Sequence, residues 1–356
     1  MKILIVCGGT GGHIFPGLAF GKLASKEHET VFIGGLGGME ETILKTEGFK
    51  FISIPVGKIL RRFTLKNLFN MFNFFRGVLA ALRVLKSEKP DIIIGFGGYV
   101  SAPVIIAGRF KKIPVALHEQ NAIPGLTNRF LSKLADRVFV SFAGTERRFG
   151  TKGVFTGNPV REEIGVMTKE EARTRLHIEA GKKVVSIIGG SQGAHTMNTF
   201  IFEALKHLKG EKLTVLWMTG EKDYALYEDR LKELPGVKPE LKRFFNNINE
   251  VYAATDLLIA RAGATTVSEA VKCGLPAIFI PFPAAANNHQ VYNARALAVK
   301  GAALMFEEAE LSGEKLAKEI ERLLANSKTL RENIIKIRTL DSAKLMLFEL
   351  RRTAGA

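Results

Sequence analysis

The stretch that decides the fold is Gly8-Gly9-Thr10-Gly11-Gly12-His13, which directly follows the apolar run Ile3-Leu4-Ile5-Val6-Cys7. A short apolar run that ends at glycines is typical of a buried strand in a parallel sheet. The small and apolar residues from 14 to 24 predict a helix, with Pro16 near its first turn, where proline is tolerated. Strand, glycine turn and helix together form a phosphate-type site, because glycine admits a close backbone approach and the helix start offers unpaired N–H groups.

The same pattern occurs twice more. The run 91–94 leads into Gly95-Phe96-Gly97-Gly98-Tyr99, and the run 184–188 leads into Gly189-Gly190-Ser191-Gln192-Gly193-Ala194. One glycine turn can serve packing alone. Three of them, divided between the halves of a 356-residue chain, indicate two nucleotide-binding-type domains that face one cleft.

Short apolar runs alternate with helical stretches along the chain, which predicts an α/β fold with doubly wound parallel sheets. The expected strands are 2–7, 30–33, 51–54, 91–95, 113–117 and 137–141, then 183–188, 213–218, 239–244, 256–260 and 277–280. The expected helices are 14–26, 38–47, 65–87, 101–110, 125–134, 169–176, 291–300, 314–326 and about 328–352. Gly157-Asn158-Pro159-Val160-Arg161 interrupts the alternation and is interpreted as a linker.

Composition bounds the class of protein. The two cysteines, Cys7 and Cys273, are too few for a disulfide framework, so we expect free thiols in a reducing compartment. We expect no signal peptide and no bilayer-spanning segment. The chain has 51 Lys and Arg against 35 Asp and Glu, a formal net charge of +16. This excess suits nucleic acid, a phospholipid surface or phosphorylated substrates, unless it is a species habit of lysine-rich surfaces.

Much of that charge lies in residues 58–89, where eight Lys and Arg side chains accompany Glu88 alone among the acids. Phe69, Phe72, Phe75 and Leu79 recur every three or four residues there, which places them on one helix face. Phe and Leu interleaved with Arg61, Arg62 and Lys66 favour an anionic membrane surface. A nucleic-acid site would instead show Tyr, Trp and polar side chains, and packing inside the domain is the other alternative.

The second half carries two polar clusters. Glu269 lies about a turn into the helix that follows Arg261-Ala262-Gly263-Ala264, where it either accepts hydrogen bonds from a ribose diol or stabilises the helix dipole. Asn287-Asn288-His289-Gln290 offers neutral hydrogen-bonding groups suited to sugar hydroxyls, or is simply a capped loop.

The sequence lacks the motifs of several common chemistries. We find no Ser/His/Asp ordering, no Cys/His metal spacing and no Walker lysine after a glycine loop. The dinucleotide fingerprint fails at 8–13, and no acid ends the second expected strand. No Asp-x-Asp occurs, so we expect a bound diphosphate to rely on helix N-termini and arginine rather than on a metal or another cofactor.

The motifs resemble those of glycosyltransferase family 28, and they run in order along nearly the whole chain. Matching segments are those at 8–13, 97–103, 118–121, 125–128, 157–161, 189–194, 261–264, 289–290 and 293–294. The resemblance implies a GT-B fold of two Rossmann-like domains and transfer of N-acetylglucosamine from UDP-N-acetylglucosamine (UDP-GlcNAc) to undecaprenyl-diphospho-muramoyl-pentapeptide, lipid I, giving lipid II. It implies an acceptor and membrane domain of residues 1–160 plus 338–356 and a UDP-GlcNAc domain of residues 161–337.

The resemblance also implies roles for single residues. The UDP-GlcNAc set is Thr10, Gly11, Gly12, Asn121, Arg161, Ser191, Phe245, Ala264, Thr265, Thr266, Val267, Ser268, Glu269, His289 and Gln290. The acceptor diphosphate is expected at Gly12, His13, Gly98 and Tyr99. The reaction would invert the anomeric centre in one displacement, with His13 as base and Glu119 as second candidate. His13 could instead cap the helix or contact the acceptor phosphate. Asn287-Asn288 departs from the family pattern, in which an acidic residue often precedes the His-Gln pair.

Location follows from the acceptor. A lipid-linked acceptor implies a peripheral protein on the cytoplasmic face of the plasma membrane, with UDP-GlcNAc, lipid I, anionic lipid and other cell-wall synthesis proteins as partners and no nucleic acid. Two alternatives remain: another GT-B enzyme, such as a UDP-GlcNAc 2-epimerase or glycolipid synthase, and a non-enzymatic basic protein that binds nucleic acid. The epimerase would not need the apolar basic helix, and the nucleic-acid binder would not need three glycine loops.

Overall fold

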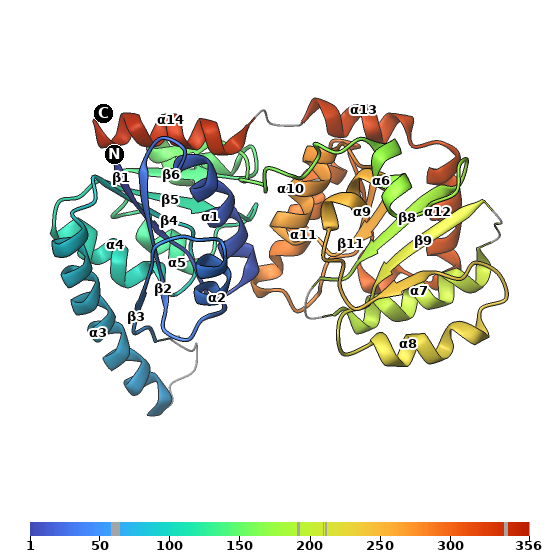
Figure 1. The fold of residues 1–356 in the computed structure, drawn as a ribbon, viewed down its shortest axis with the longest axis horizontal. Helices are drawn as coiled ribbons and strands as arrows, with labels where there is room; N and C mark the ends of the chain where they lie inside the picture. The colour runs from blue at the N-terminus through green and yellow to red at the C-terminus, as the bar shows by residue number, and fades with distance from the viewer. Residues whose placement is uncertain (58–64, 191–192, 209, 211, 338–340, 356) are drawn as a thin grey trace. The chain divides into compact units, whose positions relative to one another are not determined.

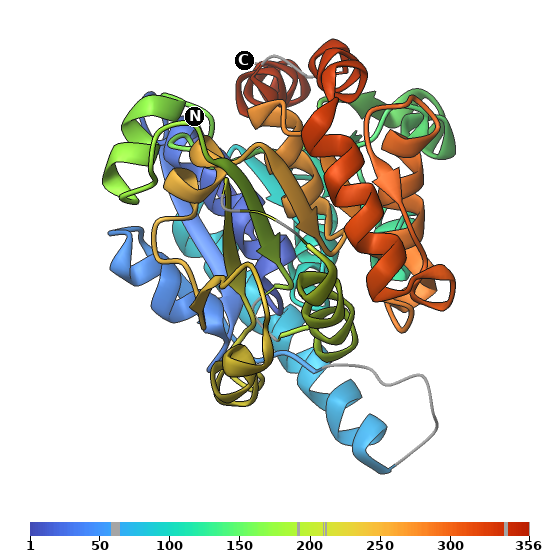
Figure 2. The same cartoon turned by 90° about the vertical axis from the view of Figure 1, so that its right-hand side faces the viewer.

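The computed structural model describes residues 1–57, 65–190, 193–208, 210, 212–337 and 341–355, with the backbone alone at 65–69. The chain divides into two compact units. Unit 1 comprises Met1–Arg161 and Thr339–Ala356, and unit 2 comprises Glu162–Arg338. In each unit a twisted sheet lies between layers of helices (Figures 1 and 2).

The described part of unit 1 holds a seven-stranded parallel sheet in the order β3-β2-β1-β4-β5-β6-β7. Its strands are β1 (Lys2–Val6), β2 (Glu29–Gly35), β3 (Phe51–Ile54), β4 (Ile92–Gly95), β5 (Val115–Glu119), β6 (Arg137–Val140) and β7 (Gly153–Phe155). Its α-helices are α1 (Gly11–Ala24), α2 (Met39–Thr46), α3 (Leu65–Glu88), α4 (Ser101–Phe110), α5 (Leu126–Leu131) and α14 (Ser342–Ala354), and a 3-10 stretch covers Thr145–Lys152.

Strand β1 shows why an apolar run without alternation becomes the centre of this sheet. Ile3 and Ile5 belong to one buried cluster, with Leu18 of α1 and Leu347 of α14. Leu4 and Val6 belong to the other, with side chains of α3 and α4 that include Val104. Since both faces are covered, every position of the strand gains from an apolar side chain.

The described part of unit 2 repeats the arrangement with a six-stranded parallel sheet in the order β10-β9-β8-β11-β12-β13. Its strands are β8 (Lys183–Ile188), β9 (Leu213–Met218), β10 (Glu240–Lys242), β11 (Leu257–Ala260), β12 (Ala277–Phe279) and β13 (Leu304–Met305). Its α-helices are α6 (Lys169–Arg175), α7 (His195–His207), α8 (Tyr224–Arg230), α9 (Ile248–Ala254), α10 (Ala264–Cys273), α11 (His289–Ala298), α12 (Gly313–Ala325) and α13 (Lys328–Lys336). Strand order reverses beside β1 and beside β8, and ligands of open α/β sheets bind at such points, outside the carboxyl ends of the strands.

The expected α/β fold with two Rossmann-like parallel sheets is confirmed, but several details differ, among them the helices α8 and α9, which were not predicted. The single helix expected over 328–352 is two helices, since α13 ends at Lys336 and α14 begins at Ser342, where the Asp341 side chain accepts from the Lys344 N–H. The short strands β7 and β13 were not predicted, because two or three half-buried residues leave little periodicity. Strand β10 covers three residues of the six expected.

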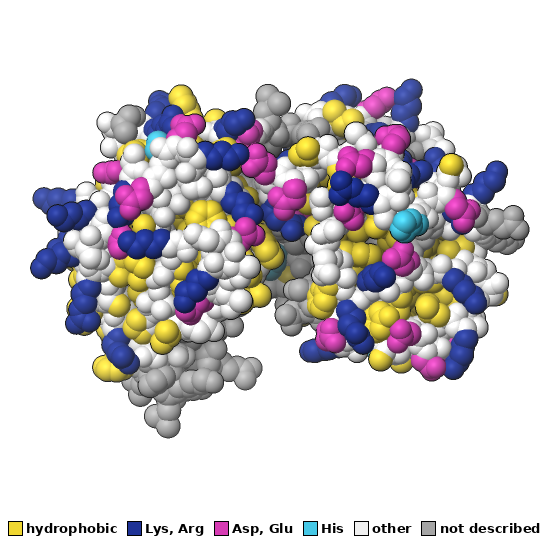
Figure 3. All heavy atoms as spheres, viewed as in Figure 1, with side chains coloured by type: hydrophobic (Ala, Val, Ile, Leu, Met, Phe, Trp, Pro, Cys, Tyr) yellow, Lys and Arg dark blue, Asp and Glu magenta, His cyan; other side chains and the backbone are white. Residues whose placement is uncertain are grey.

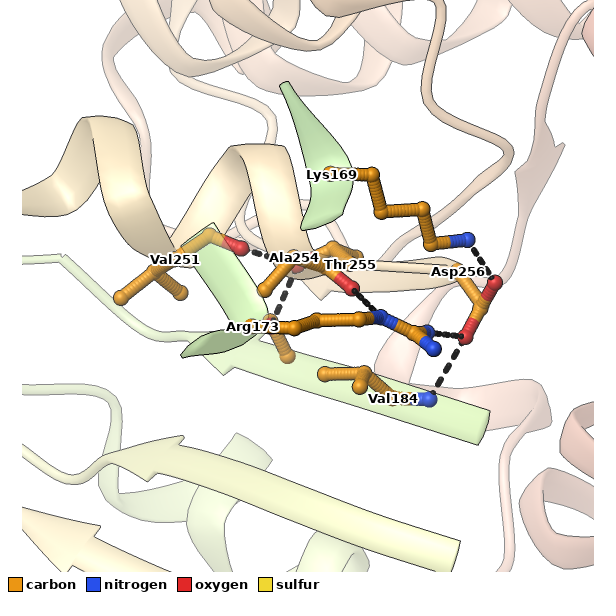
Figure 4. Close-up of polar contacts among 8 residues, drawn as sticks. Lys169, Arg173, Val184, Val251, Ala254, Thr255 and Asp256 are labelled. Carbon is orange, nitrogen blue, oxygen red and sulfur yellow. Dashed lines mark hydrogen bonds and ion pairs between the residues drawn. The ribbon is translucent and has the colours of Figure 1, made fainter. Parts of the chain in front are cut away.

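Helix α6 is attached to the sheet of unit 2 through Asp256, the residue before β11 (Figure 4). Lys169 and Arg173 of α6 both pair with this carboxylate, Arg173 at 2.7 Å, and the Val184 N–H donates to it at 2.8 Å. Burial alone would raise the pKa of Asp256, but these three partners hold it below its ordinary value. The network lies at the amino end of the strands, opposite the glycine loop.

Candidate active site

The first glycine loop joins β1 to α1 in unit 1. Gly9 adopts a positive φ of 86°, and the Tyr99 ring lies 3.0 Å from the point where a Cβ would stand. Thr10 precedes the helix but does not cap it with its side chain, whose Oγ1 instead lies 3.2 Å from His13 Nδ1. The Gly11 and Gly12 N–H groups fall in the first turn of α1, where no intrahelical acceptor exists.

The second glycine loop, after β4, packs on the first. Gly97 and Gly98 both have positive φ, 87° and 76°. A Cβ at Gly97 would lie 3.3 Å from the His13 ring and 3.4 Å from Asn128 Nδ2, and a Cβ at Gly98 would lie 2.8 Å from the Gly8 carbonyl oxygen. The imidazole of His13 therefore rests on bare backbone, and the predicted group of Gly12, His13, Gly98 and Tyr99 comes together within unit 1.

Glu119 ends β5 and is only 1% exposed. Its Oε1 accepts from the Asn121 N–H at 2.9 Å and the Asn121 side chain at 3.3 Å. Its Oε2 accepts from the Gly125 N–H at 3.0 Å and from Asn128 Nδ2 at 2.9 Å. Burial raises the pKa of Glu119 above its ordinary value although these four bonds oppose the shift. The carboxylate thus fixes the loop from Asn121 to Gly125.

His118, the preceding residue of β5, is fully buried. Its Nδ1 lies 3.1 Å from the Gln120 amide nitrogen, and its Nε2 lies 3.2 Å from the carbonyl oxygen of Gly157, at the start of the linker. Burial lowers the pKa of His118 to about 4, so the ring is neutral at physiological pH and its Nε2–H donates to Gly157. No role was predicted for His118, because the sequence around this strand residue does not reveal a partner 39 positions away.

Several buried polar atoms near this edge of unit 1 have no hydrogen-bond partner among the described residues. They are Gln120 Oε1, Asn128 Oδ1 and both amide atoms of Asn158. Such atoms usually bind water or a ligand, so they support a polar ligand site at the end of β5. Arg161, the last residue of unit 1's first segment, places its guanidinium 5.6 Å from the centre of the Phe15 ring of α1.

In unit 2 the third glycine loop turns at Gly190 and Gly193, with φ of 94° and 76°, before α7. Ser191, expected to face a diphosphate, lies outside the described residues. Beside the loop, a bonded chain that the sequence analysis missed runs from the buried Trp217 through Asn198 and Asp223 to the exposed His195.

The second feature of unit 2 is the start of α10. Its residues Ala264 and Val267 are buried, while Thr265, Thr266 and Ser268 are half-buried. Glu269 is 5% exposed, and its Oε2 accepts from the Tyr252 hydroxyl of α9 at 2.9 Å. Tyr252 was not predicted as a partner, because only the fold brings α9 and α10 together.

The remaining predicted donor residues lie before and within α11 and after β10. Asn287 and Asn288 are exposed and left-handed, with φ of 54° and 53°. His289 Nδ1 lies 2.7 Å from the Ala286 carbonyl oxygen, and Gln290 Oε1 accepts from the Phe282 N–H at 2.9 Å. Phe245 is half-buried and packs on the small cluster around Leu216. The loop thus orders itself through His289 and Gln290, and the two asparagines face solvent.

The predicted membrane face falls on α3. Arg61 and Arg62 lie outside the described residues, as do the side chains of Lys66 and Phe69. Phe72 and Phe75 are each 60% exposed and Leu79 is 56% exposed, whereas Gly77, Ala81 and Leu85 on the other side of the helix are buried. Lys and Arg side chains gather along the outer margin of unit 1 on the α3 side (Figure 3). The described part of this stripe is therefore surface rather than core.

The described residues contain neither a group of side chains suited to a metal ion nor a helix suited to cross a bilayer. No three His, Cys, Asp or Glu side chains in them are grouped as a metal ion would require. No helix in them has the length and apolar content needed to cross a bilayer.

Two Rossmann-like units with glycine loops at the carboxyl ends of their strands define an α/β protein of the nucleotide-binding type. Comparison narrows this class: residues 3–140 match the glycosyltransferase family 28 N-terminal domain, and residues 184–346 match its C-terminal domain. The chain belongs to glycosyltransferase family 28.

Two relatives illustrate the membership, both named UDP-N-acetylglucosamine--N-acetylmuramyl-(pentapeptide) pyrophosphoryl-undecaprenol N-acetylglucosamine transferase. The one from Halalkalibacterium halodurans is 40% identical over 331 residues, 91% of each chain. The one from Halothermothrix orenii is 39% identical over 344 residues, 93% of this chain and 92% of its own.

Solved structures share the fold. Acinetobacter baumannii MurG superposes with a TM-score of 0.78 at 28% identity and covers 99% of both chains. A UDP-GlcNAc 2-epimerase from Neisseria meningitidis reaches 0.71 at 15% identity over 99% of this chain and 100% of its own.

Proposed function

We propose that this chain transfers N-acetylglucosamine from UDP-GlcNAc to undecaprenyl-diphospho-muramoyl-pentapeptide, converting lipid I to lipid II in peptidoglycan synthesis. Relatives that carry this activity in their names match about nine-tenths of the chain at about 40% identity. The observation that carries the proposal is the cluster in unit 1, where His13 ends the first glycine loop and rests on the second, beside a buried carboxylate network. An epimerase shares the fold alone, at 15% identity.

Unit 2 binds the donor in this proposal. Glu269 takes the ribose, the backbone at Phe245 takes the uracil, and Gln290 with His289 takes the sugar hydroxyls. The residues Ala264, Thr265, Thr266, Val267 and Ser268 line the nucleotide pocket, and Ser191 with the start of α7 binds the diphosphate. Buried Ala264 begins α10 and contributes its backbone N–H group, whereas the Val267 N–H already donates to the Gly263 carbonyl oxygen at 2.9 Å.

Unit 1 holds the acceptor and supplies the base. The acceptor diphosphate binds at Gly12, His13, Gly98 and Tyr99, and Thr10, Gly11, Asn121 and Arg161 contact the transferred sugar or its diphosphate. The muramoyl hydroxyl oxygen attacks the anomeric carbon and gives its proton to His13. The bond to UDP breaks with both electrons on the leaving oxygen, so configuration inverts in one step. The start of α7 and Arg161 stabilise the departing charge without a metal.

His13 is the better base of the two candidates. Its ring is half-buried and rests on Gly97 and Gly98, its Nδ1 lies 3.2 Å from Thr10 Oγ1, and imidazole is the side chain that serves most often as a general base. Glu119 already accepts four hydrogen bonds, which leaves its carboxylate no lone pair in position to take a proton. We therefore assign Glu119 to holding Asn121 and Asn128 in place.

Mass spectrometry of products tests the reaction. Incubation with UDP-GlcNAc and a lipid I analogue should give the disaccharide lipid and UDP, in the same yield with and without a chelator. An epimerase would convert UDP-GlcNAc to its 2-epimer without any acceptor. That product, or no product, would contradict the proposal.

The lipid-linked acceptor also implies where the protein acts. In this proposal it is a peripheral protein on the cytoplasmic face of the plasma membrane. A prenyl tail leaves the bilayer at a cost of ~0.8 kcal/mol per exposed CH₂, so the enzyme must approach the membrane. The exposed Phe72, Phe75 and Leu79 would enter the headgroup boundary, while Arg76, Arg83 and Lys86 of α3 would meet anionic lipid at ~1 kcal/mol each.

Vesicle co-sedimentation tests this surface. Binding should be strong on anionic vesicles, weaker on neutral ones, and reduced by salt. Replacing Phe72 and Phe75 with Ser should weaken it, and so should replacing Arg61, Arg62 and Lys66 with Ser. The same change at Val299, an apolar residue of unit 2 that is 75% exposed, is the matched control and should leave binding unchanged. Equal binding to both lipids would contradict the assignment.

A further inference from the structure

Glu40 of α2 is a fully buried carboxylate to which the proposed reaction gives no role. It is 0% exposed. Its Oε1 accepts from the N–H of Gly35, the last residue of β2, at 2.8 Å. Its Oε2 accepts from the N–H of Gly9 in the first glycine loop at 3.3 Å. One side chain thus ties the end of a strand to the loop that leads to His13, and burying a carboxylate is costly unless it is bonded in this way.

The glycines around Glu40 make room for it. A Cβ on Gly8, Gly34 or Gly38 would lie less than 3.0 Å from an atom of this side chain. These three glycines are absent from the positive-φ positions of the chain, so conformational freedom does not explain them. The carboxylate occupies the space of a side chain at Gly8 and Gly38, and Glu40 Cγ together with the Phe51 ring occupies it at Gly34, so these three glycines make room for one acid.

Glu40 also lies beneath the second glycine loop. The Tyr99 ring covers Gly9, the residue that Glu40 binds, and Val100 approaches the Cβ position of Gly8 at 3.1 Å. Burial raises the pKa of the Tyr99 hydroxyl, and the charge of Glu40 adds to the shift. The carboxylate is therefore close to both loops that we assign to the acceptor diphosphate.

The bond to Glu40 decides what the first loop can offer a ligand. The Gly9 N–H is already used, so an anion must bind further along, at the start of α1, where Gly11 and Gly12 lie. The same bond supports the left-handed Gly9, from which the chain turns into Thr10 and His13. A shift at Gly9 would move the imidazole relative to Gly97 and Gly98, on which it rests.

We propose that Glu40 is a positioning residue for the transfer reaction: it clamps Gly9 and Gly35 and so sets the first glycine loop and His13 against the acceptor. This inference rests on the proposed function, because it assigns the loop to the acceptor. It predicts that a change at Glu40 impairs turnover of lipid I while binding of UDP is unaffected.

Glu40→Gln and Glu40→Ala test the clamp. Gln keeps the size but turns an NH₂ group toward one of the two backbone N–H groups, so one bond is lost; Ala loses both. We expect kcat with a lipid I analogue to fall about 10- to 100-fold in Glu40→Gln, the range for a small misplacement of catalytic groups, and further in Glu40→Ala. UDP affinity by calorimetry should change less than about twofold. Glu41→Gln, which removes a surface pair with Lys45, is the matched control and should retain wild-type kcat.

A double-mutant cycle of Gly38→Ala and Glu40→Ala tests the same contact if the single Glu40→Ala variant folds poorly. Gly38→Ala should impair the wild type, since its Cβ would meet Glu40, but should add little to Glu40→Ala, in which that space is open. Additive effects, wild-type kcat in Glu40→Gln, or a loss of UDP affinity parallel to kcat would each overturn the proposal.

Amide hydrogen exchange separates this inference from the proposed function. Exchange of residues 8–13 should accelerate in Glu40→Gln and not in Glu41→Gln, whatever the protein catalyses. If the wild type makes no lipid II, the proposed function fails while accelerated exchange still supports the clamp. Unchanged exchange in Glu40→Gln would overturn the clamp even in an active enzyme.

Discussion

The carboxyl edges of the two sheets are built from similar strands and glycine turns but differ in how far their polar side chains are exposed. In unit 1, Glu119 and His118 are buried and bonded to their own loops, and the imidazole of His13 rests on glycine backbone. In unit 2, Asn287 and Asn288 face solvent, and the inward-facing Glu269 is held by Tyr252. The groups that we assign to the reaction are buried or packed on backbone in unit 1, whereas the unit 2 edge presents two exposed asparagines beside the residues that we assign to the sugar.

That contrast matches a division of labour. Groups that act on a transition state must be fixed before the reaction, because reorganising them costs energy at the moment of reaction. Groups that only hold a nucleotide sugar can form their bonds as it arrives. Substitutions in unit 1 should therefore lower turnover, and substitutions in unit 2 should weaken donor binding.

The largest effect should come from His13→Ala. Loss of a general base costs roughly 10²–10⁴ in rate, so turnover of a lipid I analogue should fall by that factor. Calorimetric UDP affinity should stay near that of the wild type, because the nucleotide is assigned to unit 2. Near wild-type turnover would show that the base is another residue, and a parallel loss of UDP affinity would contradict the division of roles between the two units.

The next effect concerns the pH dependence of folding. The pKa of His118 is lowered to about 4 by burial, against about 6.5 in an unfolded chain. Between these values the unfolded state binds the proton better, so the stability that the neutral ring contributes is complete above pH 6.5 and is lost as the pH falls toward 4. We expect a loss of roughly 3 kcal/mol.

Thermal unfolding between pH 7 and pH 4 measures this loss. His118→Asn should flatten the pH dependence, and His207→Asn, at an exposed position of α7, should leave it as in the wild type. Identical slopes in all three proteins would contradict the assignment of this dependence to His118.

Glu269→Ala should have a medium effect, confined to the donor. Hydrogen bonds to a charged group contribute about 2 kcal/mol, so UDP binding should weaken by that amount. Tyr252→Phe removes the hydroxyl that donates to this carboxylate and should cost about 1 kcal/mol of UDP binding. Unchanged UDP affinity in a folded Glu269→Ala protein would remove Glu269 from the donor site.

The sequence predicted the central strands of the fold better than the side-chain contacts of the site. Apolar runs before glycines located β1, β4 and β8, since strands covered on both faces must be apolar throughout. The same logic could not find β7 or β13, whose few residues are half-buried.

The candidate site shows the same limit. His13, Glu119 and Glu269 were proposed from motifs, but several partners that position the residues of the site lie far along the chain or in a helix without any signature. Gly157 binds His118, Tyr252 binds Glu269, and Glu40 binds Gly9. The spacing of glycines in the sequence predicts where the backbone can bind a ligand. The side-chain partners depend on how the elements pack in the folded chain.

The smallest effect should come from Asp256→Asn, which tests whether the contrast belongs to the ligand edges or to the units as wholes. Asn keeps an acceptor for the Val184 N–H but loses the charge that pairs with Lys169 and Arg173. The folded pKa of Asp256 lies below its ordinary value, so its contribution is present at pH 7 and is lost only as the pH falls through that lowered value. Because Lys169 is partly exposed, we expect thermal unfolding at pH 7 to show a loss of only about 1 kcal/mol.

Asp256 precedes β11, at the amino end of the strands, whereas Glu269 and the third glycine loop lie beyond the carboxyl ends. UDP affinity and turnover should therefore match the wild type, and a weakened donor would mean that unit 2 transmits strain across its sheet.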